Sequence, residues 1–76
     1  MKELVGVIAK ALVEHPEEVV VTEEEKDGET VVTLKVAASD MGKVIGKQGR
    51  IARAIRAVVK AASAKTDQKV IVDITQ

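Results

Sequence analysis

The dipeptide Asp27-Gly28 lies between two segments of β-strand character, and it restricts the fold more than any other feature of the sequence. Residues 19–22 are β-branched, and an Asp-Gly pair between extended segments is a strong signal for a tight hairpin. Residues 30–36 alternate between two faces, which is typical of a strand with one face buried. The sequence therefore predicts two antiparallel strands. The residues expected to face the core are Thr30, Val32, Leu34 and Val36.

Helical periodicity flanks this hairpin on both sides. Residues 2–14 are expected to form a helix that ends before Pro16, because the residue preceding a proline avoids helical angles. A short helix is predicted at 41–45, with Ser39 or Asp40 as its N-terminal cap. Residues 50–64 are rich in alanine and give the strongest helix prediction. The expected apolar stripes are Leu4, Val5, Ile8, Ala11 and Leu12 in the first helix, and Ile51, Ile55, Val58 and Ala62 in the last.

A last strand is predicted at 69–74, after the polar loop 65–68. Strands joined through helices pair in parallel, so the last strand should run parallel to the second. We therefore expect an α+β fold of order α-β-β-α-α-β, with a three-stranded mixed sheet and helices on one face. A chain of 76 residues has room for one domain, 1–76. Val20, Val31 and Ile71 fall off the predicted core faces and could leave an apolar sheet surface.

Charge is distributed unevenly, although the net charge of the chain is zero. Residues 1–32 carry three lysines and nine carboxylates, whereas residues 33–76 carry nine Lys or Arg and three Asp. From Lys43 to Lys69, eight cations accompany a single carboxylate, Asp67. A polyanion bound to one surface is one interpretation of this asymmetry, and ordinary solvated surface charge is the other.

Composition excludes several classes of function. The absence of cysteine excludes disulfides, thiolate metal sites and thiol chemistry. A single histidine, His15, and no aromatic residues exclude a multi-histidine metal site and an aromatic platform for base stacking. No membrane span or secretory signal is visible. We therefore expect a cytoplasmic protein without metal or cofactor, in which His15 is a helix-end residue and the glutamate runs are solvated charge.

The segment Gly42–Arg50 reads Gly-Lys-Val-Ile-Gly-Lys-Gln-Gly-Arg, and its residues 46–49 lie between the two predicted C-terminal helices. Glycines have no Cβ, so a partner can approach the backbone closely. The helix that follows directs its unpaired N–H groups and positive dipole end at this loop, which favours an anion such as a phosphate. The alternative is a tight turn between two helices with surface cations.

Two other phosphate-binding loops fit the glycine spacing poorly. A Walker-type loop needs a glycine five residues before Gly46, where Met41 stands, and Ser or Thr after the lysine, where Gln48 stands. A dinucleotide fingerprint needs the pattern Gly-x-Gly-x-x-Gly, whereas the glycines here are Gly42, Gly46 and Gly49.

The run Val44–Arg50, followed by Ile51 and Ile55, resembles the hallmark of the K-homology (KH) domain. The element order is similar to the prokaryotic, type II version of that fold, and the resemblance covers essentially the whole chain. It is closest to the small bacterial KH proteins called KhpA, to which the segment His15-Pro16-Glu17 is also similar. The resemblance implies a shallow groove between two walls. The short helix, the loop 46–49 and the start of the long helix form one wall, and the sheet with the loop 65–69 forms the other.

KH loops clamp the backbone of about four single-stranded nucleotides, so the resemblance implies three kinds of site residue. Those expected to contact phosphates are Gly46, Lys47, Gln48 and Gly49. The supporting cations are Lys43, Arg50 and Arg53. Val44 and Ile45 are expected to form an apolar groove floor. Because no aromatic side chain is available for stacking, we expect weak binding of low specificity by a monomer.

The resemblance also implies partners. It implies that the chain forms a homodimer, or a heterodimer with a larger protein that carries its own KH domain. It further implies that the chain acts as an RNA chaperone and affects cell shape and envelope synthesis. The expected function is therefore non-enzymatic binding of single-stranded RNA, with neither a membrane nor a small-molecule substrate as partner. A protein-interaction module on a KH scaffold is one alternative, since fold does not fix function. A small enzyme acting on a phosphorylated ligand is another, with Asp40 as the one candidate base near the loop.

Overall fold

The computed structural model describes residues 1–46, 49–64 and 66–76. None of the described helices combines the length and the apolar character that crossing a membrane requires. The predicted order α-β-β-α-α-β is confirmed, with one short 3-10 helix, η1, that the sequence did not predict. The elements are α1 (Lys2–Leu12), η1 (Pro16–Glu18), β1 (Val20–Lys26), β2 (Glu29–Lys35), α2 (Ala38–Ile45), α3 (Arg50–Ser63) and β3 (Lys69–Thr75).

The three strands form one mixed sheet in the order β1-β2-β3. β1 and β2 pair antiparallel from Val20 opposite Lys35 to Lys26 opposite Glu29, and β2 and β3 pair in parallel. Asp27 and Gly28 have φ angles of 52° and 79°, and a hairpin turn with two positive φ angles matches the twist of its strands. The predicted hairpin and the predicted parallel pair are both confirmed.

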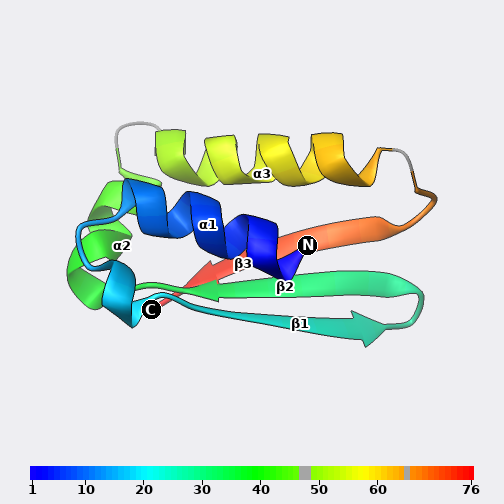
Figure 1. Ribbon diagram of the computed structural model, residues 1–76, viewed down its shortest axis with the longest axis horizontal. Coiled ribbons are helices and arrows are strands. Elements are labelled where there is room, and N and C mark those ends of the chain that lie inside the picture. The colour runs from blue at the N-terminus through cyan, green and yellow to red at the C-terminus, as the bar shows by residue number, and fades with distance from the viewer. Residues whose placement is uncertain (47–48, 65) are drawn as a thin grey trace.

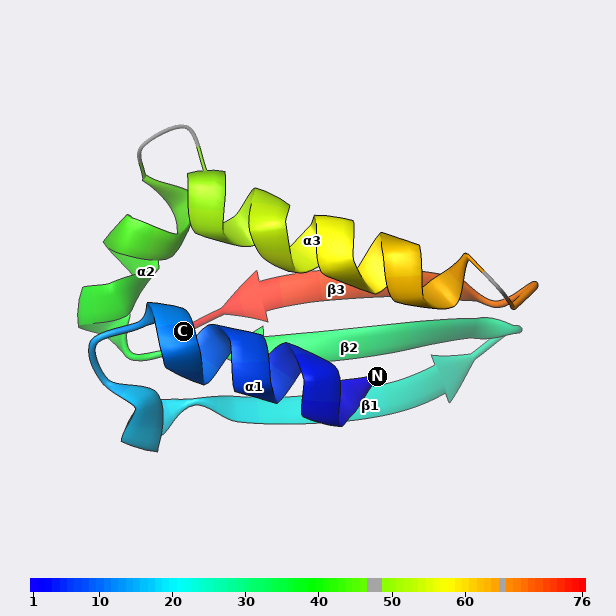
Figure 2. The same ribbon diagram turned by 45° about the horizontal axis from the view of Figure 1, so that its top comes forward.

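Two helices cover one face of this sheet. α1 and α3 lie side by side over it, and α2 lies at the end where β2 and β3 finish (Figures 1 and 2). α1 packs on β1, α3 packs on β3, and the two helices contact each other. α2 also contacts α3, and the two helices meet at one end of the molecule (Figure 2).

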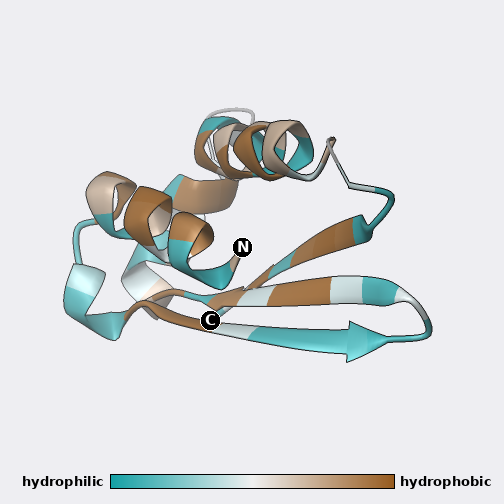
Figure 3. Ribbon diagram, turned by 45° about the vertical axis from the view of Figure 1, so that its right-hand side comes forward, coloured by the Kyte–Doolittle hydropathy of each residue, from teal (hydrophilic) through white to brown (hydrophobic). Residues whose placement is uncertain are grey.

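The core lies between the helices and the central strand β2. The predicted core face of β2 is confirmed, because Thr30, Val32, Leu34 and Val36 are all buried. Each large aliphatic side chain buried in this way stabilises the fold by roughly 1.5–3 kcal/mol. Figure 3 shows hydrophobic bands along β2 and β3, whereas β1 is hydrophilic over most of its length. The buried apolar residues from the helices are Val5, Ala9, Val44, Ala52, Ile55 and Val59.

The predicted apolar stripes of the two long helices were partly wrong. Leu12 is 45% exposed and Val58 is 38% exposed, whereas Ala9, Ala52 and Val59 are buried. The inward faces of the two helices therefore include Ala9, Ala52 and Val59 beside the correctly predicted Val5 and Ile55. The residues of the predicted stripes that are exposed are Ala11, Leu12, Val58 and Ala62.

Asp40 does not cap α2, which corrects the prediction from the sequence. The N-cap residue is Ala37, with extended backbone and no side-chain hydrogen bond. Asp40 is 1% exposed, and its carboxylate accepts hydrogen bonds from the backbone N–H groups of Glu14 and His15, each at 3.0 Å. The side chain therefore joins α2 to the segment that follows α1.

Candidate functional site

Gly46 and Gly49 belong to the turn between α2 and α3, and Gly46 is required by a close backbone contact. It follows α2 directly, with φ −75° and ψ 176°. The N–H of Gly49 donates to the carbonyl oxygen of Gly46 at 2.9 Å. A Cβ at position 46 would overlap the carbonyl oxygen of Gly42, one helical turn earlier. The chain therefore leaves α2 along a path that only glycine permits.

Gly49 is required by its backbone angles instead. Its φ of 67° and ψ of 33° lie in the left-handed region, where another residue costs roughly 1–2 kcal/mol. No atom lies within 4 Å of a Cβ built there, so crowding is not the cause. Gly49 is also the N-cap of α3, and it has no side chain that could cap the helix.

The start of α3 is suited to an anion. Its first turn contains no acidic residue, and its first backbone N–H groups have no partner within the helix. These groups and the positive end of the helix dipole favour negative charge beside Gly49. Gly46 and Gly49 are only half-buried, so their backbone is partly accessible. Lys47 and Gln48 lie outside the described residues, and their predicted phosphate contacts stay predictions.

The predicted cations differ in their surroundings. Arg50 and Arg53 are exposed on α3, and no carboxylate among the described residues forms an ion pair with either. Lys43 on α2 is 52% exposed, and its Nζ forms an ion pair with the carboxylate of Glu14. The two arginines of α3 are therefore available to an anion, whereas the charge of Lys43 on α2 is partly neutralised by Glu14.

The two predicted floor residues are placed differently. Val44 is completely buried and packs in the core, and its predicted place in the groove floor stays a prediction. Residues 40 and 44 are one helical turn apart, so the face of α2 that buries Asp40 buries Val44 as well. Ile45 is 57% exposed beside Gly46. Of the pair, only Ile45 presents an apolar surface next to the turn.

A hollow of about 550 Å³ lies between α3 and β3. Its floor is largely apolar, and three of its lining residues are cationic: Arg56, Lys60 and Lys69. Arg53, Arg56 and Lys60 share one flank of α3, so positive charge continues from the turn toward this hollow. Their spacing of three and four residues is the sequence signal that could have added Arg56 and Lys60 to the predicted site. The remaining lining residues are Val59, Ser63, Gln68, Val70, Ile71 and Val72.

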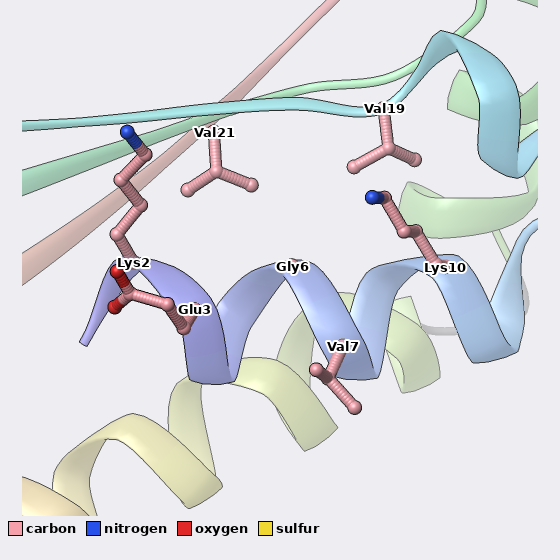
Figure 4. A pocket seen from close by; sticks show the side chains of 7 residues that line it. All are labelled: Lys2, Glu3, Gly6, Val7, Lys10, Val19 and Val21. Atoms are coloured by element: carbon pink, nitrogen blue, oxygen red, sulfur yellow. The ribbon is translucent and has the colours of Figure 1, made fainter.

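A second hollow, of about 330 Å³, lies between α1 and β1 and contains none of the predicted site residues. Figure 4 shows Lys2 and Lys10 reaching from α1 toward β1, while Val7 points away from the strand. Val19 and Val21 form the opposite side. This hollow is separated from the turn and is not part of the candidate site.

Among the described residues, one group could hold a metal ion by its donor spacing: His15, Glu17 and Glu18, whose ligand atoms lie within 4.8 Å of one another. The Nδ1 atom of His15 is 3.4 Å from a carboxylate oxygen of Glu17. The two carboxylates are exposed, as expected of the solvated charge that the sequence predicts.

Comparisons with known proteins identify the family. The family model described as "KhpA/KhpB, KH domain" matches residues 2–74. The chain belongs to the KhpA/KhpB KH-domain family. The predicted resemblance is confirmed, and the helix and strand order with its mixed sheet agrees with the type II KH fold. Residues 46–49 correspond to the Gly-x-x-Gly loop of KH domains.

Several curated KhpA proteins are similar to the chain over nearly its whole length. "RNA-binding protein KhpA" of Clostridium perfringens (strain 13 / Type A) is 60% identical over 74 residues, which cover 97% of this chain and 99% of that protein. The protein of the same name from Caldanaerobacter subterraneus subsp. tengcongensis is 58% identical, with the same coverage. That of Listeria monocytogenes serovar 1/2a is 51% identical over 76 residues, the whole of both chains. No solved structure gives a significant match.

Proposed function

We propose that the chain is a non-enzymatic protein that binds single-stranded RNA at the turn between α2 and α3. The observation that carries this proposal is the left-handed Gly49 at an uncapped helix start that is flanked by exposed arginines. The similar KhpA proteins are named RNA-binding proteins, which supports RNA as the anion.

In the proposed complex, the RNA backbone passes over the turn. The glycines allow a phosphate to approach the peptide backbone, and the N–H groups at the start of α3 donate to it. Lys47 and Gln48 add a charge and further donors, and Arg50 and Arg53 follow the strand along α3. KH loops hold about four nucleotides in this way.

The bases are proposed to lie toward Ile45 and the hollow between α3 and β3. That hollow has an apolar floor and is bordered by Arg56, Lys60 and Lys69. Apolar contacts and hydrogen bonds to base edges take the place of stacking, because the chain has no aromatic side chains. Without stacking worth ~1–3 kcal/mol per base, a single copy should bind weakly.

A protein partner is part of the proposal, since linked weak sites gain effective concentration. Apolar side chains are exposed on α1 and α3, which lie side by side: Val7 is 69% exposed, Leu12 45% and Val58 38%. The family description names KhpA together with KhpB. We propose a homodimer, or a heterodimer with a larger KH protein. The family resemblance further suggests an RNA chaperone in the cytoplasm that influences cell shape and envelope synthesis.

The second candidate is a protein-interaction module with little affinity for RNA. The zero net charge and the exposed aliphatic side chains favour it. Crosslinking in cells, followed by sequencing of the bound RNA, separates the two functions. RNA recovered with the chain supports the first, whereas a robust protein partner without RNA supports the second.

The direct test replaces Lys47 and Gln48 with aspartate together and measures the fluorescence anisotropy of a labelled single-stranded RNA. The double variant should lose binding, because negative charge would face the phosphates. For the unchanged chain, about three phosphate contacts predict a slope of roughly −2 for the logarithm of affinity against that of salt. The matched control is Lys10→Asp with Gln76→Asp, two exposed positions outside the turn. Equal affinity of both double variants would contradict the proposal.

A further inference from the structure

Glu14 is held at two points by residues of α2, the helix that leads into the Gly-x-x-Gly loop. Its backbone N–H donates to the carboxylate of Asp40 at 3.0 Å. Its side-chain carboxylate forms an ion pair with the Nζ of Lys43. Asp40 and Lys43 are three positions apart, so both contacts come from neighbouring points on one helix.

The backbone contact makes the position of Glu14 well defined. Asp40 is 1% exposed, and both of its carboxylate oxygens accept hydrogen bonds, one from Glu14 and one from His15. A buried carboxylate with charge-assisted hydrogen bonds is a strong anchor. The segment that follows α1 is thereby fixed against α2, and the carboxylate of Glu14 is kept within reach of Lys43.

The ion pair itself is at the surface. The side chain of Lys43 is 52% exposed and that of Glu14 is 67% exposed, so solvent screens the attraction between them. Exposed pairs of this kind are weak and exchange readily. A phosphate of a bound strand can therefore replace the carboxylate as the partner of the ammonium group, but it does so in competition with Glu14.

We propose that Glu14 is an affinity-determining residue of the RNA site, because its carboxylate competes with a phosphate for Lys43. This inference rests on the proposed function of the Gly-x-x-Gly loop. It adds Glu14, a residue that follows α1 and lies far from the loop in the sequence. The carboxylate of Glu14 lowers the affinity of the site for RNA. Asp40 acts as the positioning residue that keeps this competitor in place.

The proposal predicts that Glu14→Gln tightens the binding of a short single-stranded RNA by about two- to fivefold, the range expected of an exposed ion pair. It also predicts a steeper salt dependence. Without its competitor, Lys43 would contact a phosphate in a larger share of the complexes, which makes the log–log slope steeper by up to about 0.7 on single strands. A purely structural role of Glu14 would leave that slope unchanged. The fold should persist, because the hydrogen bond to Asp40 uses only the backbone of Glu14.

The matched control is Glu17→Gln, which removes the same charge from the same segment. Glu17 is exposed, and its carboxylate lies beside His15, not Lys43. The experiment measures fluorescence anisotropy across a salt series for the unchanged chain, both single variants, Lys43→Gln and the double variant Lys43→Gln with Glu14→Gln. Circular dichroism verifies folding, and Glu14→Ala, which retains the backbone N–H, serves as a second variant.

Tighter binding and a steeper slope for Glu14→Gln alone, both lost in the Lys43→Gln background, support the inference. If Glu14→Gln matches Glu17→Gln, or if its gain persists without Lys43, the effect is general charge and the inference is wrong, although the proposed function stands. If the unchanged chain binds no RNA, the proposed function is wrong and the inference falls with it.

Discussion

The carbonyl oxygen of Gly42 occupies the space that a Cβ at Gly46 would need. This contact lies at the point where α2 ends and the Gly-x-x-Gly loop begins. It makes Gly46 indispensable for a steric reason, whereas Gly49 is needed for its left-handed backbone angles. The two glycines of the motif therefore have separate structural causes, and substitutions should reveal them separately.

Gly46→Ala should destabilise the fold by about 1–3 kcal/mol, the usual cost of forcing an extra group into a filled space. Gly42→Ala is the matched control, because no atom lies within 4 Å of a Cβ at that helical position. It should be neutral or stabilise α2 by up to about 1 kcal/mol. Urea unfolding monitored by circular dichroism measures both free energies. Equal stabilities of the two variants would contradict the steric assignment.

Gly49→Ala should cost about 1–2 kcal/mol, since alanine is strained at positive φ. Gly49→Asn should cost less than Gly49→Ala, because asparagine tolerates left-handed angles better than alanine does. Thermal unfolding of the two variants, compared with the unchanged chain, tests this order. An alanine variant as stable as the asparagine variant would mean that backbone strain is not what requires the glycine.

Asp40→Ala should destabilise the chain by about 2–4 kcal/mol, because it leaves the backbone N–H groups of Glu14 and His15 without their acceptor. Asp73→Ala is the control, since Asp73 is exposed on β3. The free energy of unfolding in urea gives both values. A loss for Asp40→Ala no larger than that for Asp73→Ala would remove the case for Asp40 as an anchor of α2.

Thr30→Val should stabilise the chain by about 1 kcal/mol. Thr30 is 4% exposed, and its hydroxyl is the one buried side-chain polar group among the described residues that has no hydrogen-bond partner. Valine has nearly the same shape and removes the cost of burying that hydroxyl. Thr33→Val, at a half-buried position on the same strand, is the comparison. A destabilised Thr30→Val would indicate that the hydroxyl has a partner after all.

Most of the fold could be predicted from short patterns of adjacent residues. Asp27-Gly28 defined the hairpin because its two positive φ angles are a property of those residues alone. The alternation along β2 identified the buried strand, and the Gly-x-x-Gly spacing located the turn. Each of these features is read from a few adjacent positions, so the sequence was sufficient.

Contacts between distant segments were not predictable in the same way. The partners of Asp40 lie 25 and 26 positions away, so nothing near Asp40 distinguished an anchor from a helix cap. The complete burial of Val44 depends on how α2 meets the core, which its neighbours in the sequence do not show. The buried faces of α1 and α3 likewise depend on packing against the sheet, and helical periodicity predicted them only to within a neighbouring position.

The most direct measurement of the central claim is an amide NMR titration of the chain with a short single-stranded RNA. We predict that the largest shifts occur at Gly46, Gly49 and Arg50, with smaller ones along α3 toward the hollow beside β3. Amides of β1 should be unaffected. Shifts concentrated between α1 and β1, around Gly6 and Val21, or no shifts at saturating RNA, would contradict an RNA site at the turn between α2 and α3.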